Sequence, residues 1–315
     1  MKKIAAIAAA LMLFTAFASC AEKLNESSSE PAQGNNSSQV GETAEQTAAE
    51  NSTQVVSDEK NPLTGLRGYN EAAVGKRPVA IMVNNIKASL PQYGIEQADV
   101  IYEIPVEGGI TRLMAVYADY TNVPDICSIR SCRYYYPILA YGMDAIYCHW
   151  GRDMTIANDT LNRLDIDNID GSGDAYGELY FRDEAREETY ATEHTGYLKG
   201  SALAETIENM GYRTDLLPDQ PVSMFSFNSE ENPVTPEGVA CMSVDIPFSG
   251  EYYSDFEYDS ASGVYKKFHS GEPHMDSATG NQLSFTNVFV LYTEISLRGE
   301  GALVDVELSG GDGYY

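Results

Sequence analysis

The sequence predicts a mixed α/β protein, with alternating strands and helices in its N-terminal part and a mainly antiparallel β region after them. Up to about residue 218, apolar runs typical of buried strands alternate with segments of helical periodicity. From residue 219 onward, short strand-like runs follow one another and are separated by turn residues. A chain of 315 residues is long enough for two domains. We therefore expect an α/β domain at 61–218 and a β-rich domain at 219–315.

The N-terminal part contains four strand-like runs and three helix-like runs. The pair Gly108-Gly109 separates the second strand from the third. Pro137 fits the first turn of the first helix, and Gly211 ends the third helix. The expected strands are PVAIMVNN (78–85), ADVIYEIPVEGG (98–109), ITRLMAVYAD (110–119) and DAIYCHW (144–150), and the expected helices are YYYPILAYGM (134–143), DMTIANDTLNRL (153–164) and LKGSALAETIENMGY (198–212).

The C-terminal part is predicted to consist of strands alone. The segment YDSASGVYKKF (258–268) has the turn chemistry of a hairpin. The expected strands are VSMFSFN (222–228), GVACMSVDIPF (238–248), YYSDFEYD (252–259), VYKKFHSG (264–271), NVFVLYTEIS (287–296) and LVDVELSG (303–310).

The N-terminus has the pattern of a lipoprotein signal peptide. Lys2 and Lys3 precede an apolar run at 4–18, and FASC then places small residues directly before Cys20. We expect residues 1–19 to be removed and Cys20 to carry the lipid. Residues 20–60 contain few large apolar side chains and an excess of acidic ones, which predicts a disordered acidic tether of about 35 Å. The expected location is the outer face of the cytoplasmic membrane.

The charge balance limits the possible partners. Asp and Glu number 47 against 20 Lys and Arg, which gives a formal net charge of −27. Nucleic acid is excluded as a partner, because neutralising its phosphates needs a basic surface. Broad attraction to anionic lipid is excluded for the same reason, so the acyl chains must supply most of the membrane anchoring.

Four cysteines remain after lipidation: Cys127, Cys132, Cys148 and Cys241. Four scattered thiols in a large domain do not resemble a disulfide framework. Cys127 and Cys132 are close enough in sequence to pair, although small buried free cysteines are common.

The stretch ICSIRSCRYYYPILAYGMDAIYCHWG (126–151) is the strongest candidate for a binding site. If the strand at 110–118, the helix at 134–143 and the strand at 144–150 form one βαβ unit, the loop that carries Arg130, Ser131 and Arg133 lies at the carboxyl edge of the first strand. His149 and Arg152 then lie at the same edge. Guanidinium groups beside a helix N-terminus suit a carboxylate, phosphate or sulfate ligand.

Further residues join this candidate site by their proximity in the predicted layout. Tyr134, Tyr135 and Tyr136 offer stacking faces for a sugar or peptide. The other candidate ligand-binding residues are Arg112 and Arg182, and the candidate acid–base or structural partners are Glu103, Glu107, Asp183 and His194. Three of these lie in YFRDEAREETYATEHTGY (180–197), which either joins the same crevice or forms a solvated run of charges. An internal ion network is the alternative, in which Glu103, Glu107 or Asp99 pairs with the arginines. Alternatively, His149 is a core histidine whose ring nitrogens are hydrogen-bonded within the fold.

The sequence indicates neither a metal site nor a cofactor. It contains no His-Glu-x-x-His, Gly-x-Ser-x-Gly or phosphate-cradling glycine loop. The oxygen-rich segment DIDNIDGSGDAYGE (165–178) does not fit the EF-hand register, so a polar surface loop is the better interpretation.

The chain resembles the YerB-like lipoproteins of Gram-positive bacteria. The resemblance covers Asn61 to the end and is carried by NPLTGL, RPVAIMVNN, LPQYGIEQADVIYEIPVEGGITRLMAVY, SIRSCRYY, DAIYCHWG, YFRD, HMDSATGNQL and NVFVLYTE. It implies two domains of unknown function and a layered ββα-type sandwich, with no established catalytic role. The residues that match the family pattern are Glu107, Gly108, Thr111, Arg112, Arg130, Ser131, Arg133, Arg182, Asp183 and His194.

Two departures from the family pattern bear on these expectations. Family members have small uncharged residues around the arginine motif, so Cys127 and Cys132 are local choices that weaken any thiol chemistry. Family members also continue beyond GGDGYY, so we expect the C-terminal domain to be truncated.

Three functional hypotheses follow. The leading one is a non-enzymatic envelope lipoprotein that binds an anionic small molecule, an envelope glycan or a protein of wall assembly through Arg112, Arg130 and Arg133. The alternative is an enzyme on envelope glycan or a phosphate-linked polymer, in which His149 or Glu107 does acid–base work. The third is a structural adaptor whose arginines are paired internally. Saturation of the arginines by Glu103 and Glu107 would exclude both ligand hypotheses.

Overall fold

The computed structural model describes residues 55–173, 175–218, 225–229, 231–232, 234, 237–298 and 303–314. The predicted signal peptide, Cys20 and the tether before residue 55 lie outside these residues. Within the described part of the chain, no helix is both long and apolar enough to cross a membrane.

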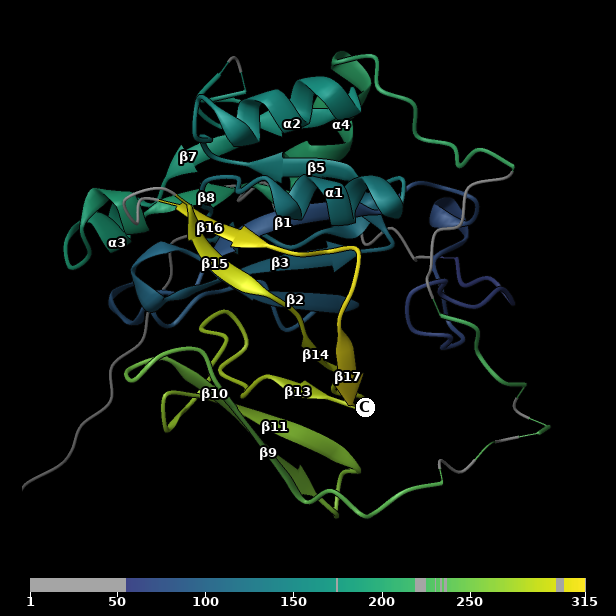
Figure 1. The fold of residues 1–315 in the computed structure, drawn as a ribbon. Helices are drawn as coiled ribbons and strands as arrows, with labels where there is room; N and C mark the ends of the chain where they lie inside the picture. Colours follow the sequence, from purple (N-terminus) through teal and green to yellow (C-terminus); the bar gives the residue numbers. More distant parts are fainter. Residues whose placement is uncertain are drawn as a thin grey trace, which may run out of the picture. The chain divides into compact units, whose positions relative to one another are not determined.

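A five-stranded mixed sheet forms the centre of the N-terminal part (Figure 1). Its strands run in the order β2-β3-β1-β5-β6, with β1 antiparallel to β3 and parallel to β5, which is itself parallel to β6. The strands are β1 (Val79–Asn84), β2 (Val100–Pro105), β3 (Thr111–Tyr117), β5 (Ile146–His149) and β6 (Asn168–Asp170).

The predicted βαβ unit is wrong in one respect. The strand parallel to β5 is β1, whereas β3 runs antiparallel to β1. The N-terminal end of β3, rather than its C-terminal end, therefore shares the edge where β5 ends. Hairpin pairing of β2 with β3 fixes this direction, because the turn at Gly108-Gly109 reverses the chain.

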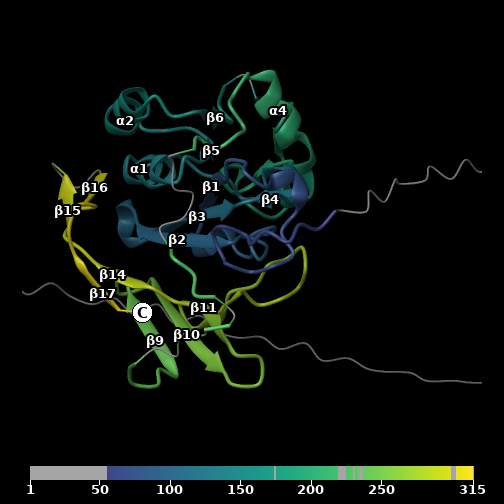
Figure 2. The same ribbon diagram turned by 90° about the vertical axis from the view of Figure 1, so that its right-hand side faces the viewer.

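The alternation of apolar side chains along β1 gives the sheet a core on each face. Ala80 and Met82 belong to one buried cluster, and Val79, Ile81 and Val83 belong to the other. Helices α1 (Tyr135–Gly142) and α2 (Ile156–Leu164) cover the first face, and α4 (Leu203–Asn209) covers the second (Figure 2).

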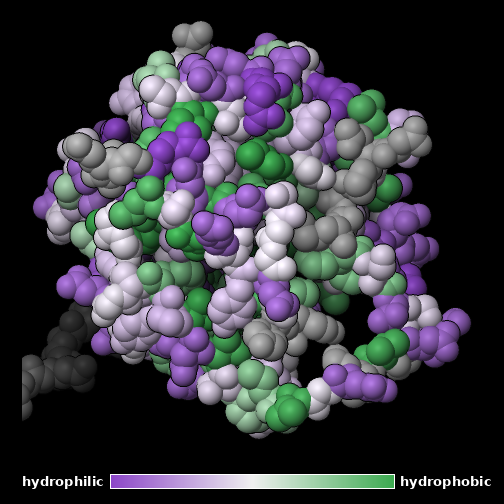
Figure 3. Space-filling model, in the orientation of Figure 1, coloured by the Kyte–Doolittle hydropathy of each residue, from purple (hydrophilic) through white to green (hydrophobic). Residues whose placement is uncertain are grey.

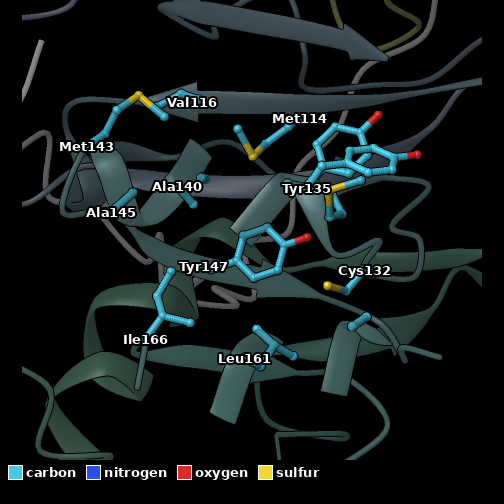
Figure 4. Packing of buried hydrophobic residues seen from close by; sticks show 14 of the residues in the cluster. Met114, Val116, Cys132, Tyr135, Ala140, Met143, Ala145, Tyr147, Leu161 and Ile166 are labelled. Atoms are coloured by element: carbon cyan, nitrogen blue, oxygen red, sulfur yellow. The ribbon is translucent and has the colours of Figure 1, made fainter. Parts of the chain in front are cut away.

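Figure 4 shows the cluster of the first face, where the ring of Tyr147 projects from β5 among Ala140 of α1, Leu161 of α2 and Cys132. These layers confirm the predicted mixed α/β sandwich.

A three-stranded sheet of order β4-β8-β7 packs on the second face. Its strands are β4 (Ile126–Cys127), β7 (Tyr180–Arg182) and β8 (Gly196–Leu198). The predicted helix at 198–212 is shortened, because Leu198 pairs with both β4 and β7 before the helical turns begin. The short helices of this part are η1 (Glu71–Ala73), η2 (Lys87–Ser89), η3 (Glu107–Gly109), η4 (Tyr120–Asn122), α3 (Glu184–Glu187), η5 (Thr192–His194) and η6 (Gly200–Ala202).

The C-terminal part contains a sheet of order β12-β11-β10-β9, with β13 also paired to β11. The predicted hairpin is the β10–β11 pair. Two further antiparallel pairs, β14–β17 and β15–β16, divide the single strand expected at 287–296. The bounds are β9 (Ser243–Pro247), β10 (Tyr253–Asp259), β11 (Val264–His269), β12 (Glu272–Pro273), β13 (Ser284–Phe285), β14 (Val290–Tyr292), β15 (Ile295–Arg298), β16 (Leu303–Val306) and β17 (Asp312–Tyr314).

The expected strand at 222–228 is wrong in its described residues, 225–228, which form no strand. Phe225 instead stacks on Phe289, with ring centroids 5.3 Å apart.

A buried polar junction joins β10 and β11 to the central sheet. Glu103 of β2 accepts hydrogen bonds from Asn85 (3.0 Å), Thr111 (2.8 Å) and Ser254 (2.8 Å). Its Oε2 also lies 2.8 Å from Nζ of Lys267, whose side chain is 3% exposed. Burial alone would raise the pKa of Glu103, but the Lys267 charge and these hydrogen bonds hold it below its ordinary value. We call this group the Glu103–Lys267 junction.

Candidate functional site

The carboxyl ends of β1, β5 and β6 share one edge of the central sheet, and the arginine loop returns to that edge. The backbone N–H of Arg130 donates to the carbonyl of Met82 at 3.1 Å. Trp150 donates in turn to the carbonyl of Arg130 at 3.1 Å, and Cys132 donates to Gly151 at 2.9 Å. The segments SIRSCR and HWG therefore run side by side where parallel strands end, which is a common place for ligands in α/β sheets.

Arg112 reaches this edge from the start of β3. It lies directly opposite Asn84, the last residue of β1, in the β1–β3 register. Its Nη1 donates to the carbonyl of Ser131 at 2.8 Å, and only 5% of the residue is exposed. Its nearest carboxylate oxygen in the described chain belongs to Glu107 and is 4.0 Å away.

The guanidinium groups of Arg130 and Arg182 donate hydrogen bonds to carbonyl oxygens rather than to carboxylates. Arg130 Nη1 donates to Glu193 O at 3.1 Å, and Arg182 Nη1 donates to Thr192 O at 2.6 Å. The guanidinium carbon of Arg182 lies 4.3 Å from the ring centroid of Trp150. Among the described residues, no carboxylate lies within 4.0 Å of either guanidinium.

Arg112, Arg130 and Arg182 form a group that we call the arginine cluster. Burial lowers the pKa of Arg130, the positive charges of Arg112 and Arg182 lower it further, and the negative charge of Glu193 partly opposes them. The Nε atom of Arg130 is buried and has no hydrogen-bond partner in the described part of the chain. Because arginine stays protonated, the cluster retains mutual repulsion and an unused donor.

His194 of η5 borders the cluster. Its Nδ1 lies 3.0 Å from Nδ2 of Asn84, whose Oδ1 accepts from Ile86 N at 3.3 Å. This arrangement makes the amide the donor, so Nδ1 of His194 accepts and the neutral ring carries its proton on Nε2. Burial lowers the pKa of His194, and the charge of Arg130 adds to that effect. Near neutral pH the imidazole thus supplies a neutral N–H donor.

The other predicted basic residues have carboxylate partners. Arg133 makes a two-point contact with Glu107, whose Oε2 lies 2.9 Å from Arg133 Nε. Arg152 donates to Asp170 and, through Nε, to Asn158 at 3.0 Å. The internal-network interpretation therefore describes Arg133 and Arg152, and it does not describe Arg130 or Arg182.

His149 and Asp183 have structural contacts. The His149 ring is buried, with Nδ1 3.0 Å from Gly151 O and Nε2 3.2 Å from Asn168 Oδ1. Burial lowers its pKa. Asp183 caps α3 by accepting from Arg186 N at 3.1 Å, and it also accepts from the hydroxyl of Tyr93 at 3.0 Å.

The predicted stacking faces are wrong for Tyr135 and Tyr136, whereas Tyr134 is half-buried and its hydroxyl donates to Val306 O at 3.1 Å. Tyr135 and Tyr136 are fully buried, because they occupy the inner face of α1. Their hydroxyls donate to carbonyls of β2 and β3, including Pro105 O at 2.6 Å and Arg112 O at 2.8 Å. They support the strand that carries Arg112.

Asn84 and Trp150 belong to the site, and the sequence did not single out either of them. Asn84 is the last residue of an apolar strand, and no motif in the sequence marks it as a site residue. Trp150 is the single tryptophan of the chain and stood inside the candidate stretch. A lone tryptophan at the last position of a predicted strand, near an arginine motif in sequence, is the signal that identifies it.

Among the described residues, no three His, Cys, Asp or Glu side chains gather around a common point. The four described cysteines are free thiols, three of them buried. A surface hollow of about 340 Å³ lies at the far end of β3, near Asp99 and Asp119. Asp99 there accepts from Asn61 at 2.7 Å, and Asp119 accepts from Asn70 at 2.7 Å. The arginine cluster is thus the better candidate site.

Comparison with known protein families identifies the family to which the chain belongs. The N-terminal domain model of a protein of unknown function, DUF3048, matches residues 63–213, and the corresponding C-terminal domain model matches residues 244–315. The chain belongs to the DUF3048 family.

This DUF3048 protein is similar to YerB of Bacillus subtilis (strain 168), which carries the name of a lipoprotein. The two are 26% identical over 266 residues, which cover 81% of this chain and 73% of YerB. The crystal structure of Bacillus subtilis YerB superposes with a TM-score of 0.67 and covers 81% of this chain and 82% of that one. The expected membership of the YerB-like family is confirmed, and the activity of the family is unknown.

Proposed function

We propose that this protein is a lipid-anchored binding protein of the cell exterior whose arginine cluster takes an anionic ligand. The single observation that carries the proposal is the shortage of carboxylates around the arginine cluster: among the described residues, none lies within 4.0 Å of the guanidinium groups of Arg130 or Arg182. A chain with 47 acidic residues has ample carboxylates to neutralise three arginines, yet no described carboxylate does so for Arg130 or Arg182. An incoming anion would relieve the repulsion between the guanidinium groups.

A phosphate group suits this cluster better than a carboxylate. The cluster combines three guanidinium groups, from β3, the arginine loop and β7, with the imidazole of His194, whose Nε2 lies 3.8 Å from a carboxylate oxygen of the largely exposed Glu193. A phosphate has more acceptor oxygens than a carboxylate and a larger charge at neutral pH.

The same geometry does not favour the enzyme hypothesis. His149, one of its proposed acid–base groups, is buried with both ring nitrogens hydrogen-bonded. Glu107, the other, is held by Arg133. We therefore propose no catalytic activity.

The proposed location is the outer face of the cytoplasmic membrane, with the lipid on Cys20 as the anchor. The lipoprotein name of YerB and the FASC motif support this placement. Radiolabelled palmitate should enter the wild-type protein and not Cys20→Ala. Labelling of the variant would contradict the anchor. The possible natural ligands are an envelope glycan, an anionic small molecule or an acidic segment of a wall-assembly protein.

Anion binding is tested by the fluorescence of Trp150, which is the single tryptophan and contacts Arg182. The full chain in detergent is titrated with phosphate, sulfate and acetate, and its melting temperature is followed in parallel. Phosphate should change the fluorescence and raise the melting temperature, since a ligand of the folded state stabilises it by about 2.7 kcal/mol at one hundred times Kd.

Two variants make the test specific. Arg130→Met should lose both phosphate responses. Arg163→Met, which removes an exposed arginine of α2, should keep them. No response in the wild type, or an undiminished response in Arg130→Met, would contradict the proposal.

A further inference from the structure

A row of aromatic and cationic side chains leads from the arginine cluster to the protein surface. Trp150 lies at its centre, with the Arg182 guanidinium 4.3 Å from its ring centroid on one side of the row. Tyr176 meets Trp150 edge-on, with ring centroids 5.7 Å apart. Arg182 also belongs to the arginine cluster, since it and Arg130 donate to the consecutive carbonyl oxygens of Thr192 and Glu193.

The indole is held firmly in this position. A Cβ atom on Gly196 would come within 2.8 Å of the Trp150 ring, so the backbone of β8 can approach the ring only because this residue is glycine. A Cβ atom on Gly171 would lie 3.0 Å from the same ring. Tyr180 packs against the indole as well, with ring centroids 5.6 Å apart. Trp150 therefore acts as a fixed base for the two side chains at its rim, Arg182 and Tyr176.

Tyr176 is the exposed aromatic residue of this row. It is 56% exposed, whereas Trp150 is half-buried and Tyr180 is fully buried. An exposed ring near the half-buried guanidinium of Arg182 offers an apolar face next to the proposed anion site. The apolar C–H face of a sugar ring stacks on such a tyrosine while its hydroxyls remain in water.

We infer that the site binds a hexose ring that carries a phosphate monoester, with the phosphate in the arginine cluster and the sugar on Tyr176. The inference rests on the proposed anion-binding function and names its ligand class. A nucleotide fits less well, because one exposed tyrosine gives a base a single stacking partner, while the Trp150 ring is already in contact with Arg182, Gly196 and Tyr180.

The test is calorimetric titration of the full chain in detergent with inorganic phosphate, glucose 6-phosphate, glucose and adenosine monophosphate. Glucose 6-phosphate should bind about fivefold more tightly than inorganic phosphate, as expected for one aromatic contact. Glucose alone should show no measurable binding. Tyr176→Ala should lose the preference and keep its affinity for inorganic phosphate.

Two controls isolate the aromatic ring. Tyr176→Phe keeps the ring and should keep the preference. Tyr141→Ala removes a tyrosine that is 50% exposed near the end of α1, and it should behave as the wild type.

The remaining outcomes would overturn the inference. Equal affinity of the wild type for phosphate and glucose 6-phosphate would exclude a sugar subsite and leave the proposed anion site intact. An equal loss of both affinities in Tyr176→Ala would show that the tyrosine is only structural. Tighter binding of adenosine monophosphate than of glucose 6-phosphate would replace the sugar with a nucleotide. Absence of phosphate binding would refute the proposed function itself.

Discussion

The Glu103–Lys267 junction and the arginine cluster are both polar groups in the interior of the same chain, yet they differ in how their charges are satisfied. At the junction, one carboxylate faces one ammonium group and receives three further hydrogen bonds. In the cluster, Arg112 has only Glu107 at 4.0 Å, Arg130 and Arg182 have no carboxylate within 4.0 Å among the described residues, and one donor has no partner. The comparison teaches that burial alone does not mark a functional site.

Breaking the junction should have the largest effect on stability. Lys267→Met removes the ammonium group and leaves Glu103 buried without its counter-charge. The free energy of unfolding should fall by about 3–5 kcal/mol, because an uncompensated buried charge is strongly destabilising. Chemical denaturation measures the change.

Lys266→Met is the matched control for that variant, since Lys266 lies next in β11 on the opposite face, outside the junction. It should change stability by less than about 0.5 kcal/mol. If Lys266→Met lowers the free energy of unfolding as much as Lys267→Met does, the effect comes from disturbing the strand and not from breaking the ion pair.

Lowering the pH should have the next largest effect on stability, and two histidines beside the junction should cause it. His269 and His274 donate through Nε2 to Asn85 O at 3.0 Å and Gln92 Oε1 at 2.8 Å, and each buried Nδ1 has no described partner. Burial lowers the pKa of both rings. The charges facing His269 are those of Glu103, which raises its pKa, and Lys267, which lowers it. For His274, Lys267 and His269 add to the lowering.

The sign of the pH effect follows from those lowered pKa values. The unfolded chain binds protons at these histidines near the ordinary value of 6.5, whereas the folded chain resists them. Their contribution to stability is therefore complete above that value and is lost as the pH falls below it. The melting temperature should drop between about pH 7.5 and about pH 5.5. The double variant His269→Gln, His274→Gln should show a smaller drop, and an unchanged drop would assign the effect to other groups.

The sequence predicted the elements better than their directions. Apolar alternation along residues 78–85 and helical periodicity along 134–143 and 153–164 are local properties, and β1, α1 and α2 follow them. The parallel partner of β5 is a tertiary property. It depends on the β2–β3 hairpin, which fixes the direction of β3, and no periodicity within a single strand reports it.

The candidate site was predicted as a place rather than as a set of contacts. The proximity of SIRSCR to HWG follows from strand ends that meet at one edge. The pairing of Arg133 with Glu107 and the lack of a close carboxylate for Arg130 do not follow, because they depend on which of many carboxylates the fold brings near. Tyr135 and Tyr136 show the same limit, since their spacing on α1 turns them inward.

In Figure 3, hydrophilic and hydrophobic residues are mixed over the visible face, without a single large apolar patch that would itself mark a binding surface. The site is therefore proposed from its incompletely paired arginines and not from an apolar surface.

The smallest stability change, and the most direct test of the account, is expected for Arg130→Met. The free energy of unfolding is measured by chemical denaturation for the wild type, Arg130→Met and Lys267→Met, each with and without inorganic phosphate. Without phosphate, Arg130→Met should stay within about 1 kcal/mol of the wild type, since it removes a charge that is repelled by its neighbours. Phosphate should stabilise the wild type and Lys267→Met and leave Arg130→Met unchanged. A loss in Arg130→Met as large as that in Lys267→Met, with phosphate stabilising none of the three, would show that the arginine cluster holds the fold together and binds no anion.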